Sequence, residues 1–422
     1  MNDSLSLRGV GQVAALAAVA AAARAQTAPL GVGIVGLGRR GQQRLAQLAA
    51  CPDARLVAAC DVDETTWATV PAGVKPQAEL SRLLADPAVK AVIIALPTHW
   101  TALATLLALR AGKDVLVEPP VCWSFAEGEQ LLAAAKATGR IIAVGHDNRT
   151  TASVRTGVAA AQAGAAGKVH TARAICYRPY VPTVAAKDST PPKTLRWDQW
   201  QGPAGKLAFN IGLLNGGWSH FGALGHGELA DGALDPLDTA RWMLGGDELP
   251  VAVHSSGGRF GKDVPGDAPN VQHAVFTLAD KRSLAVEIRG LPSPDEAGLR
   301  VGAIAYGASG WLSEADGFRT HLGYDDKGKP IEGLAPVTLP GAGGADVVAN
   351  FVAAVRGNAP ADVNCPLTAG VRTAQFIALA DISYKLGRAL RFDPAKGAFI
   401  DAPDADRLLA RASYPAGFSL PA

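Results

Sequence analysis

The sequence predicts an α/β protein: an N-terminal Rossmann domain with a doubly wound parallel sheet, then an α+β domain with a large, mostly antiparallel open sheet. Three observations support this fold class. A glycine-rich turn, Gly36-x-Gly38-x-x-Gly41, follows an apolar run of β-type residues. Strand and helix patterns then alternate as far as Gly145. Beyond Gly145, strand patterns follow one another with few helices between them, which is typical of an antiparallel sheet.

The elements of the first domain alternate regularly. We expect strands at 32–35, 56–60, 91–96, 114–117 and 141–144. We expect helices at 42–50, 78–84, 101–111 and 125–138. The run 91–96 is apolar without interruption, as in a strand that is buried on both faces of a parallel sheet. Such crossovers predict a ligand site at the carboxyl ends of the strands.

The second domain shows a different order of elements. We expect strands at 169–177, 251–254, 271–278, 283–288 and 301–306, and helices at 236–244, 347–356 and 367–386. A stretch rich in proline and glycine, 178–226, lies between the strand expected at 169–177 and the helix expected at 236–244. It is too long for an idle loop in a compact domain, so we expect it to bind substrate or to contact another subunit. The predicted domain limits are 27–148 and 149–395, with a C-terminal tail at 396–422.

The glycine turn predicts a nicotinamide dinucleotide site. In this pattern the first glycine permits the turn, the second admits the pyrophosphate and the third lets the helix pack on the strand. Asp61 ends the second strand, twenty residues after Gly41, where a carboxylate can accept hydrogen bonds from ribose hydroxyls. The alternative is a purely structural turn. The predicted cofactor residues here are Gly36, Leu37, Gly38, Arg39, Arg40, Gly41 and Asp61.

The choice between NAD and NADP rests on residues of opposite charge. Arg39 and Arg40 could pair with the 2′-phosphate of NADP, whereas Asp61 would repel it. We therefore expect NAD and leave NADP open.

Composition and cysteine spacing argue against a nucleic-acid partner, a disulfide framework and a zinc site. At 422 residues the chain has room for two domains of about 150 residues each. Its net charge of +2 gives no reason to expect a nucleic-acid partner. The five cysteines lack CxxC or metal-ligand spacing, which argues against a disulfide framework and against a zinc site. We expect Cys60 and Cys176 to be core residues, and we expect no metal.

The first 26 residues resemble a secretory signal peptide. Arg8 precedes an apolar run at 10–23, and Ala23-Arg24-Ala25 provides a small-x-small cleavage site. The run is too short to span a membrane comfortably, and no later segment reaches that length. We therefore expect export to the periplasm; the twin-arginine route is not favoured, since only one arginine is present. The alternative is a cytoplasmic protein with an alanine-rich leader.

Several segments resemble the Gfo/Idh/MocA family, which includes glucose–fructose oxidoreductase and inositol dehydrogenase. Pro97-Thr98-His99-Trp100 is similar to its TP-x-H-W turn, and the segment 111–120, AGKDVLVEPP, is similar to AGKHVxxEKP. Further matches are WDQWQGP at 197–203, GHGEL at 225–229, DTARW at 238–242 and ISYKLGR at 382–388. The likeness covers nearly all of 30–415.

The resemblance implies hydride exchange between a nicotinamide ring and a carbon of a sugar or cyclitol. It also implies a second domain whose sheet often forms an oligomer interface, so we expect a dimer or tetramer. Family members handle the hydroxyl proton with the lysine of E-K-P and with a D-x-x-x-H pair. This sequence departs at both places: Pro119 replaces the lysine and Asp235 replaces the histidine, while Asp231 matches the aspartate.

These departures leave the proton acceptor open. Proline has no titratable group, and an ordinary carboxylate with a pKa of about 4 is a weak base for an alcohol unless burial or Asp231 raises that pKa. Asp231 and Asp235 would share one face if both lay on a helix. Alternatively, Asp235 is the N-cap of a helix that has Pro236 at its first position.

Other residues are candidates by position. The predicted catalytic residues are Asp231, Asp235 and His226. The resemblance adds Pro97, Thr98, His99, Glu118, Pro119 and Asn148 to the predicted cofactor contacts. A displaced proton acceptor could also be Tyr177, Lys187, Lys193 or His220, while His146 and Arg149 could face substrate or cofactor. Trp197 and Trp200 could stack on a sugar or pack internally, and Lys113 is expected to be a solvated surface residue.

Three hypotheses about function follow. The first is an NAD(P)-dependent oxidoreductase acting on a sugar or polyol, with an atypical active site. The second is an NAD-dependent glycosidase or lyase that regenerates its cofactor in each cycle. The third is a non-catalytic protein that binds a cofactor or a sugar and has lost the chemistry.

Overall fold

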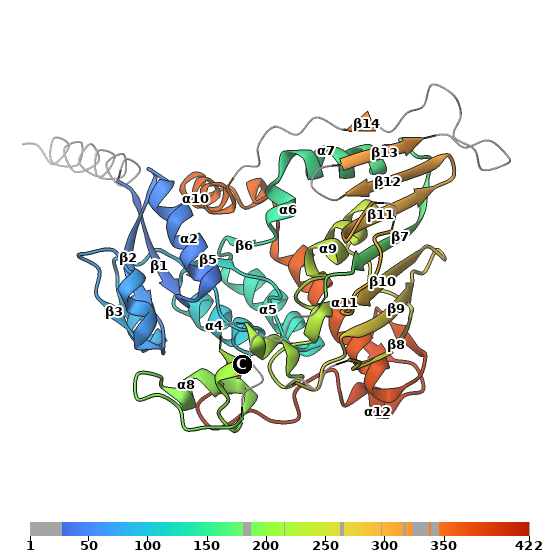
Figure 1. Ribbon diagram of the computed structural model, residues 1–422. Helices are drawn as coiled ribbons and strands as arrows, with labels where there is room; N and C mark the ends of the chain where they lie inside the picture. Colours follow the sequence, from blue (N-terminus) through green and yellow to red (C-terminus); the bar gives the residue numbers. More distant parts are fainter. Residues whose placement is uncertain are drawn as a thin grey trace, which may run out of the picture.

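A computed structural model describes residues 28–179, 187–214, 216–261, 266–296, 298–314, 318–322, 337–338 and 346–421. The predicted signal peptide, 1–26, lies outside the described residues. Two sheets organise the protein, with helices between them (Figure 1). Within the described residues, no helix is both long and apolar enough to cross a membrane.

The first sheet has six parallel strands in the order β3-β2-β1-β4-β5-β6. Its strands are β1 Leu30–Val35, β2 Ala54–Cys60, β3 Pro76–Gln77, β4 Ala91–Ile94, β5 Asp114–Val117 and β6 Ile142–Val144. The helices that follow them are α2 Arg39–Ala50, η1 Glu64–Thr69, α3 Leu80–Ala85, α4 Thr98–Arg110 and α5 Phe125–Thr138. The strand order reverses between β1 and β4, and ligands bind at such a switch point. The predicted Rossmann domain is confirmed.

The second sheet has ten strands in the order β14-β13-β12-β11-β7-β10-β9-β8-β15-β16. All its pairings are antiparallel except that between β7 and β10. The strands are β7 Val169–Cys176, β8 Ala252–Gly258, β9 Val271–Thr277, β10 Ser283–Arg289, β11 Val301–Gly307, β12 Gly310–Glu314, β13 Phe318–Leu322, β14 Val337–Thr338, β15 Leu390–Asp393 and β16 Ala398–Phe399. The predicted open sheet is confirmed.

Helices fill the space between the two sheets (Figure 1). They are α6 Asp147–Thr150, α7 Ala152–Gln162, α9 Leu234–Met243 and α11 Leu367–Leu386. The segment between β7 and α9 carries α8 Trp197–Gln201 and the short 3-10 helices η2 Gly202–Ala204, η3 Ile211–Leu213, η4 Gly217–His220 and η5 Gly227–Leu229. The remaining helices are α10 Val347–Gly357, η6 Pro360–Asp362 and α12 Pro403–Asp406. Apolar side chains of α7, α9 and α11 pack with those of the large sheet in one core.

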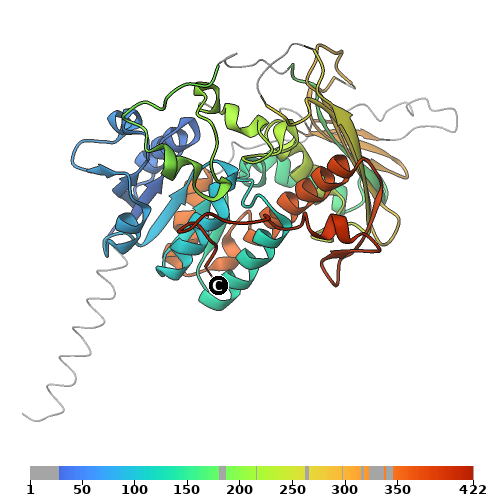
Figure 2. The same ribbon diagram turned by 90° about the horizontal axis from the view of Figure 1, so that it is seen from below.

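The C-terminal part of the chain returns to the Rossmann domain. Val348 and Phe351 of α10 are fully buried in one cluster with β1 and α2. Arg411 and Tyr414, in the tail, both donate to the Glu127 carboxylate of α5 at 3.2 and 2.8 Å. Figure 2 shows the tail running beneath the first domain. The predicted limits 27–148 and 149–395 are limits in the sequence. In space, α10 and the C-terminal tail belong partly to the first domain, because their side chains pack on it.

Two expectations about single residues have different outcomes. All five cysteines are free and buried, so the prediction that Cys60 and Cys176 are core residues is confirmed. The prediction that Lys113 is a solvated surface residue is wrong. Its ammonium group donates to the carbonyls of Val89 and Asp86 at 2.7 and 3.1 Å, since it lies beneath the turn that leads into β4. Burial lowers its pKa.

Candidate active site

The glycine turn between β1 and α2 has the geometry of a phosphate-binding loop. Gly36 has φ +90°, and a β-carbon there would lie 2.3 Å from the Ala95 carbonyl oxygen. A β-carbon at Gly41 would lie 2.0 Å from the carbonyl oxygen of Gly36. A β-carbon at Gly38 would meet no heavy atom within 4 Å, so its backbone borders open space at the start of α2. An anion can approach there, where helix amides are free.

Asp61 is placed beside this turn from the end of β2. Its Oδ2 accepts from the Leu37 backbone N–H at 2.6 Å, and its Oδ1 accepts from the Asp63 N–H at 2.8 Å. Burial raises its pKa, against these two hydrogen bonds, which lower it. An ionised carboxylate has about four acceptor sites, so sites remain for ribose hydroxyls. The Leu37 side chain is fully buried and leaves only its backbone at the turn.

Two arginines of α2 join two carboxylates in an internal network. Arg44, 1% exposed, donates to both oxygens of Glu118 at 2.6 and 3.2 Å and to Asp147 at 2.9 Å. Arg40 lies 3.2 Å from Glu118 and 3.0 Å from Asp147. Arg40 and Glu118 were predicted to bind cofactor, and both are engaged in this network. Arg39 is exposed at the surface.

The turn after β4 packs against the segment that carries α8. Pro97 precedes α4, and the side chains of Thr98 and His99 are both buried. The Nε2 of His99 lies 3.0 Å from the Trp200 carbonyl oxygen, and burial lowers the pKa of His99 to about 3. Trp197 and Trp200 stack at 4.9 Å between ring centroids. His99 and these tryptophans therefore hold α8 against the Rossmann domain.

Asp235 is bonded to a histidine from the other domain. It lies in the first turn of α9, whose N-cap is Ala233 without a side-chain cap, so the predicted capping role is wrong. Instead its Oδ1 lies 2.8 Å from Nδ1 of His146, which follows β6 and is fully buried. Burial opposes charge on this imidazole, but Asp238 and Asp235 outweigh it and raise the His146 pKa. The two groups form a dyad at the carboxyl edge of the Rossmann sheet.

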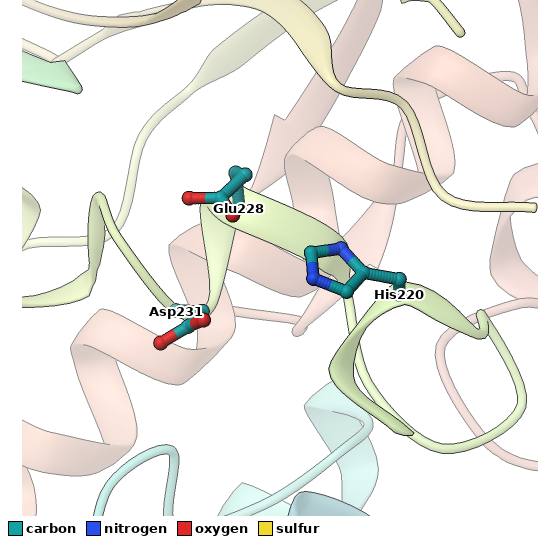
Figure 3. Close-up of side chains that lie close together, drawn as sticks. All are labelled: His220, Glu228 and Asp231. Carbon is teal, nitrogen blue, oxygen red and sulfur yellow. The ribbon is translucent and has the colours of Figure 1, made fainter. Parts of the chain in front are cut away.

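Asp231 belongs to a separate cluster. It lies in a turn before α9, so the prediction that it shares a helix face with Asp235 is wrong. Arg178 donates to Asp231 at 2.8 Å and to Glu228 at 3.0 Å. His220, Glu228 and Asp231 point toward one another (Figure 3), and one ligand atom from each lies within 4.8 Å of the others.

This cluster has the donor set of a divalent-cation site, but a cation already lies beside it. The guanidinium of Arg178 pairs with both carboxylates, so one of their two negative charges is compensated within the protein. Burial raises the pKa of Glu228, and burial lowers the pKa of His220 to about 4. The geometry thus favours an ion-pair cluster, and the expectation of no metal stays a prediction. Arg178 and Glu228 were not singled out in the sequence, although Glu228 is the acidic residue of the GHGEL motif.

His226, the third predicted catalytic residue, is held inside the protein. Its Nε2 lies 2.8 Å from the Trp123 carbonyl oxygen, and its Nδ1 lies 3.2 Å from an Asp381 oxygen. The ring stacks on Trp123 at 5.5 Å. Both nitrogens have internal neighbours, so the geometry favours a structural role that ties α11 to the loop after β5.

The remaining candidates lie in four different settings. The Asn148 amide donates to the Thr239 hydroxyl of α9 at 3.2 Å. Tyr177 donates to Glu287 and Glu296 at 3.0 and 2.8 Å, in a cluster away from His146 and Asp235. Lys187 and Lys193 are exposed. Pro119, joined to Pro120 by a cis peptide bond, brings no proton-exchanging group to the end of β5.

Comparison with known proteins shows what the first domain is similar to. Residues 30–146 match the family model described as "Oxidoreductase family, NAD-binding Rossmann fold". The match covers the first domain, which resembles that of Gfo/Idh/MocA oxidoreductases. One relative, the scyllo-inositol 2-dehydrogenase (NADP(+)) IolW of Bacillus subtilis, is 28% identical over 32% of this chain and 35% of its own. The chain spans only 22–52% of the length of the curated relatives it matches.

Solved structures extend the fold comparison to the second domain. An aldose-aldose oxidoreductase of Caulobacter crescentus, in complex with glycerol, has a TM-score of 0.64 and 19% identity over 86% of this chain and 100% of that one. The WlbA dehydrogenase of Bordetella pertussis, in complex with NADH and UDP-GlcNAcA, has a TM-score of 0.64 and 16% identity over 86% and 99% of the two chains. At these identities the likeness shows that this chain shares their two-domain fold.

Proposed function

We propose that this protein is an NAD(P)-dependent oxidoreductase that exchanges a hydride with a secondary alcohol carbon of a sugar or cyclitol, with NAD as its preferred cofactor. The observation that carries the proposal is the turn between β1 and α2. Gly36 and Gly41 are each required by a backbone contact, Gly38 alone borders open space, and Asp61 holds the turn from β2. This arrangement suits a dinucleotide whose pyrophosphate lies over the helix and whose ribose lies near Asp61.

The preference for NAD rests on charge. A 2′-phosphate near Asp61 would bring a second negative group beside a carboxylate, and Arg40, one possible counter-charge, pairs with Glu118 and Asp147. The substrate class rests on the relatives, whose names include scyllo-inositol and aldose enzymes. Hydride transfer itself is the chemistry of the nicotinamide ring when it is bound; the protein supplies position and proton exchange.

The test is to identify the nucleotide that travels with the protein. Protein purified without added cofactor should release NAD or NADP on denaturation, identified by mass spectrometry. Stripped protein should bind NAD more tightly than NADP by calorimetry. Protein that carries no nucleotide and binds neither one when it is added would overturn the proposal.

We also propose that the protein is exported and that its N-terminal segment is removed. The support is the sequence alone: a basic start, a short apolar run and Ala23-Arg24-Ala25. Expression in a bacterial host should place a shortened chain in the periplasmic fraction, with Gln26 as its first residue by N-terminal sequencing. A full-length chain confined to the cytoplasm would contradict export.

We further propose a homo-oligomer, dimer or tetramer, formed through the face of the large sheet that lies opposite α9 and α11. That face carries Val275, 46% exposed, and the half-buried side chains of Tyr306 and Trp311. An apolar surface of this kind on a sheet is typical of subunit contacts. Light scattering should give a mass of two or four chains. A monomer at micromolar concentration would contradict the proposal.

A further inference from the structure

The family places a histidine and a lysine where this protein has Asp235 and Pro119, so its proton exchange needs another group. We infer that Asp235 and His146 form a proton-exchanging dyad, in which Asp235 contacts the substrate hydroxyl and His146 holds the proton behind it. This inference rests on the proposed oxidoreductase function. It makes Asp235 a catalytic residue and His146 a positioning residue.

The place of His146 in the Rossmann sheet is the first support for the dyad. His146 follows β6 by two residues, and Pro119 follows β5 by two, so both lie at the carboxyl edge of strands on the second half of the sheet. In a doubly wound sheet that binds a dinucleotide across its switch point, one half faces the adenosine end and the other half faces the nicotinamide end. Asp61 belongs to the β2 half, and therefore the dyad lies on the nicotinamide half.

Burial assigns the two roles within the dyad. His146 is fully buried, whereas the Asp235 side chain is 39% exposed. The His146 Nε2 atom is buried and has no hydrogen-bond partner within the parts of the chain that the structure describes. The imidazole therefore exchanges its proton through Nδ1 and the Asp235 carboxylate, 2.8 Å away. A substrate hydroxyl can reach Asp235 and cannot reach His146.

The alternatives are less suited to the task. The Asp231 carboxylate, 43% exposed, is paired with Arg178, so a proton on that carboxylate would break an ion pair. The nitrogens of His226 face Trp123 and Asp381 inside the protein. Pro119 has no exchangeable proton. Among the family positions that handle the proton, Asp235 alone combines partial exposure with a histidine neighbour.

Oxidation of the substrate alcohol moves one proton to the dyad and one hydride to the cofactor. When oxidation proceeds, the substrate O–H bond breaks and its proton passes to an Asp235 oxygen, while the C–H electron pair leaves as hydride to oxidised NAD(P) and a carbonyl forms. Before the transfer, the neutral imidazole carries its own proton on Nε2, so Nδ1 can accept one. Rotation of the protonated carboxyl group about its Cβ–Cγ bond then brings the new proton to Nδ1 of His146. The dyad then holds an imidazolium beside a carboxylate, and in the reverse direction it returns the proton.

This arrangement addresses the weakness of a lone carboxylate as a base. The dyad takes up its proton near the pKa of His146, which lies above the ordinary value of about 6.5, rather than near that of an aspartate. The charged groups that face His146 are Asp235 and Asp238 from α9 and Arg149 from α6, the helix that His146 precedes. Arg241 also lies 3.7 Å from Asp238. The negative charge of Asp235 contributes to raising the pKa of the Cys365 thiol.

The experiment compares wild type with Asp235→Asn, His146→Gln and the control Asp280→Asn, a carboxylate in the exposed turn between β9 and β10. The first readout needs no cofactor: the histidine-ring NMR titration of the apoprotein. We expect the His146 midpoint to fall in Asp235→Asn, because burial then acts against one carboxylate fewer, and to stay unchanged in the control. An unchanged midpoint in Asp235→Asn would overturn the dyad.

The second readout is turnover with a panel of sugars and cyclitols. Asp235→Asn should lose at least about 100-fold in kcat while its NAD Kd stays within about twofold of wild type. In His146→Gln the alkaline rise of the pH–kcat profile should move to lower pH. Wild-type kcat in Asp235→Asn would refute the acceptor role, as would a wild type that binds NAD but oxidises nothing in the panel. Failure to bind nucleotide would instead refute the proposed function, and the NMR readout would still report on the dyad.

Discussion

Replacing Gly38 with alanine is expected to remove nucleotide binding while leaving the fold intact. The backbone there has φ −65° and ψ −172°, which alanine adopts freely, and the new β-carbon would meet no protein atom within 4 Å. The methyl group would instead occupy the space through which a pyrophosphate approaches the amides of α2. We expect the NAD Kd to rise at least about tenfold, or 1.4 kcal/mol, by calorimetry, with an unchanged Tm.

The matched control is Gly357→Ala at the end of α10. A β-carbon there would lie 3.7 Å from Ala359, an ordinary contact, so stability should not fall and nucleotide affinity should not change. By contrast, Gly36→Ala and Gly41→Ala would place a β-carbon within 2.3 Å of a carbonyl oxygen and should lower the yield of folded protein. Equal NAD affinity in Gly38→Ala and wild type would show that the nucleotide lies elsewhere.

Replacing Asp238 with asparagine is expected to cost about 3–5 kcal/mol of unfolding free energy. Asp238, fully buried on α9, accepts two bonds from Arg149 at 2.6 and 3.0 Å and one from Thr373 at 2.8 Å. Arg241 lies 3.7 Å away. The substitution keeps the shape but leaves buried guanidinium groups without their counter-charge. Urea unfolding should show the loss as a lower midpoint at an unchanged m-value.

The same carboxylate predicts a pH dependence. Burial favours the neutral acid, yet Arg149 and His146 outweigh it and hold the Asp238 pKa far below its usual range. Its stabilising contribution is therefore complete above the unfolded pKa of about 4 and is lost as pH falls toward the folded value. The control for Asp238→Asn is Asp401→Asn, which breaks an exposed pair with Arg391 at 2.9 Å. This control should leave the urea unfolding midpoint unchanged. Equal losses in the two variants would contradict the argument.

Local sequence determined much of the fold. The bounds of α5 and α11 agree with the sequence prediction. For α5 the reason is visible in a capping box between Ser124 and Glu127 and a left-handed Gly139 at its end. The helix α7 was not predicted, because its alanine-rich sequence has no capping side chain and only four of its residues are buried.

The candidate site depended on contacts that sequence spacing does not contain. Asp-Pro at 235 and 236 looked like a helix start, but the helix begins at Leu234 and the carboxylate is used by His146, a residue 89 positions away. The same holds for His99, whose partner is the Trp200 carbonyl, 101 positions away. The glycine turn could be predicted from the sequence because its glycines lie close together in the chain. The partners of Asp235 and His99 come from other elements and require the assembled fold.

The return of the chain's last segments to the first domain has a consequence for biosynthesis. Val348 and Phe351 of α10 complete the core beneath β1, and Arg411 and Tyr414 anchor on Glu127 of α5. The nucleotide-binding half leaves the ribosome first, yet the side chains that cover its apolar surface are translated last. The apolar surface of the first domain therefore stays partly uncovered until these segments have been translated. A gene fragment that stops after β6 would encode the Rossmann sheet without α10, whose side chains complete its core.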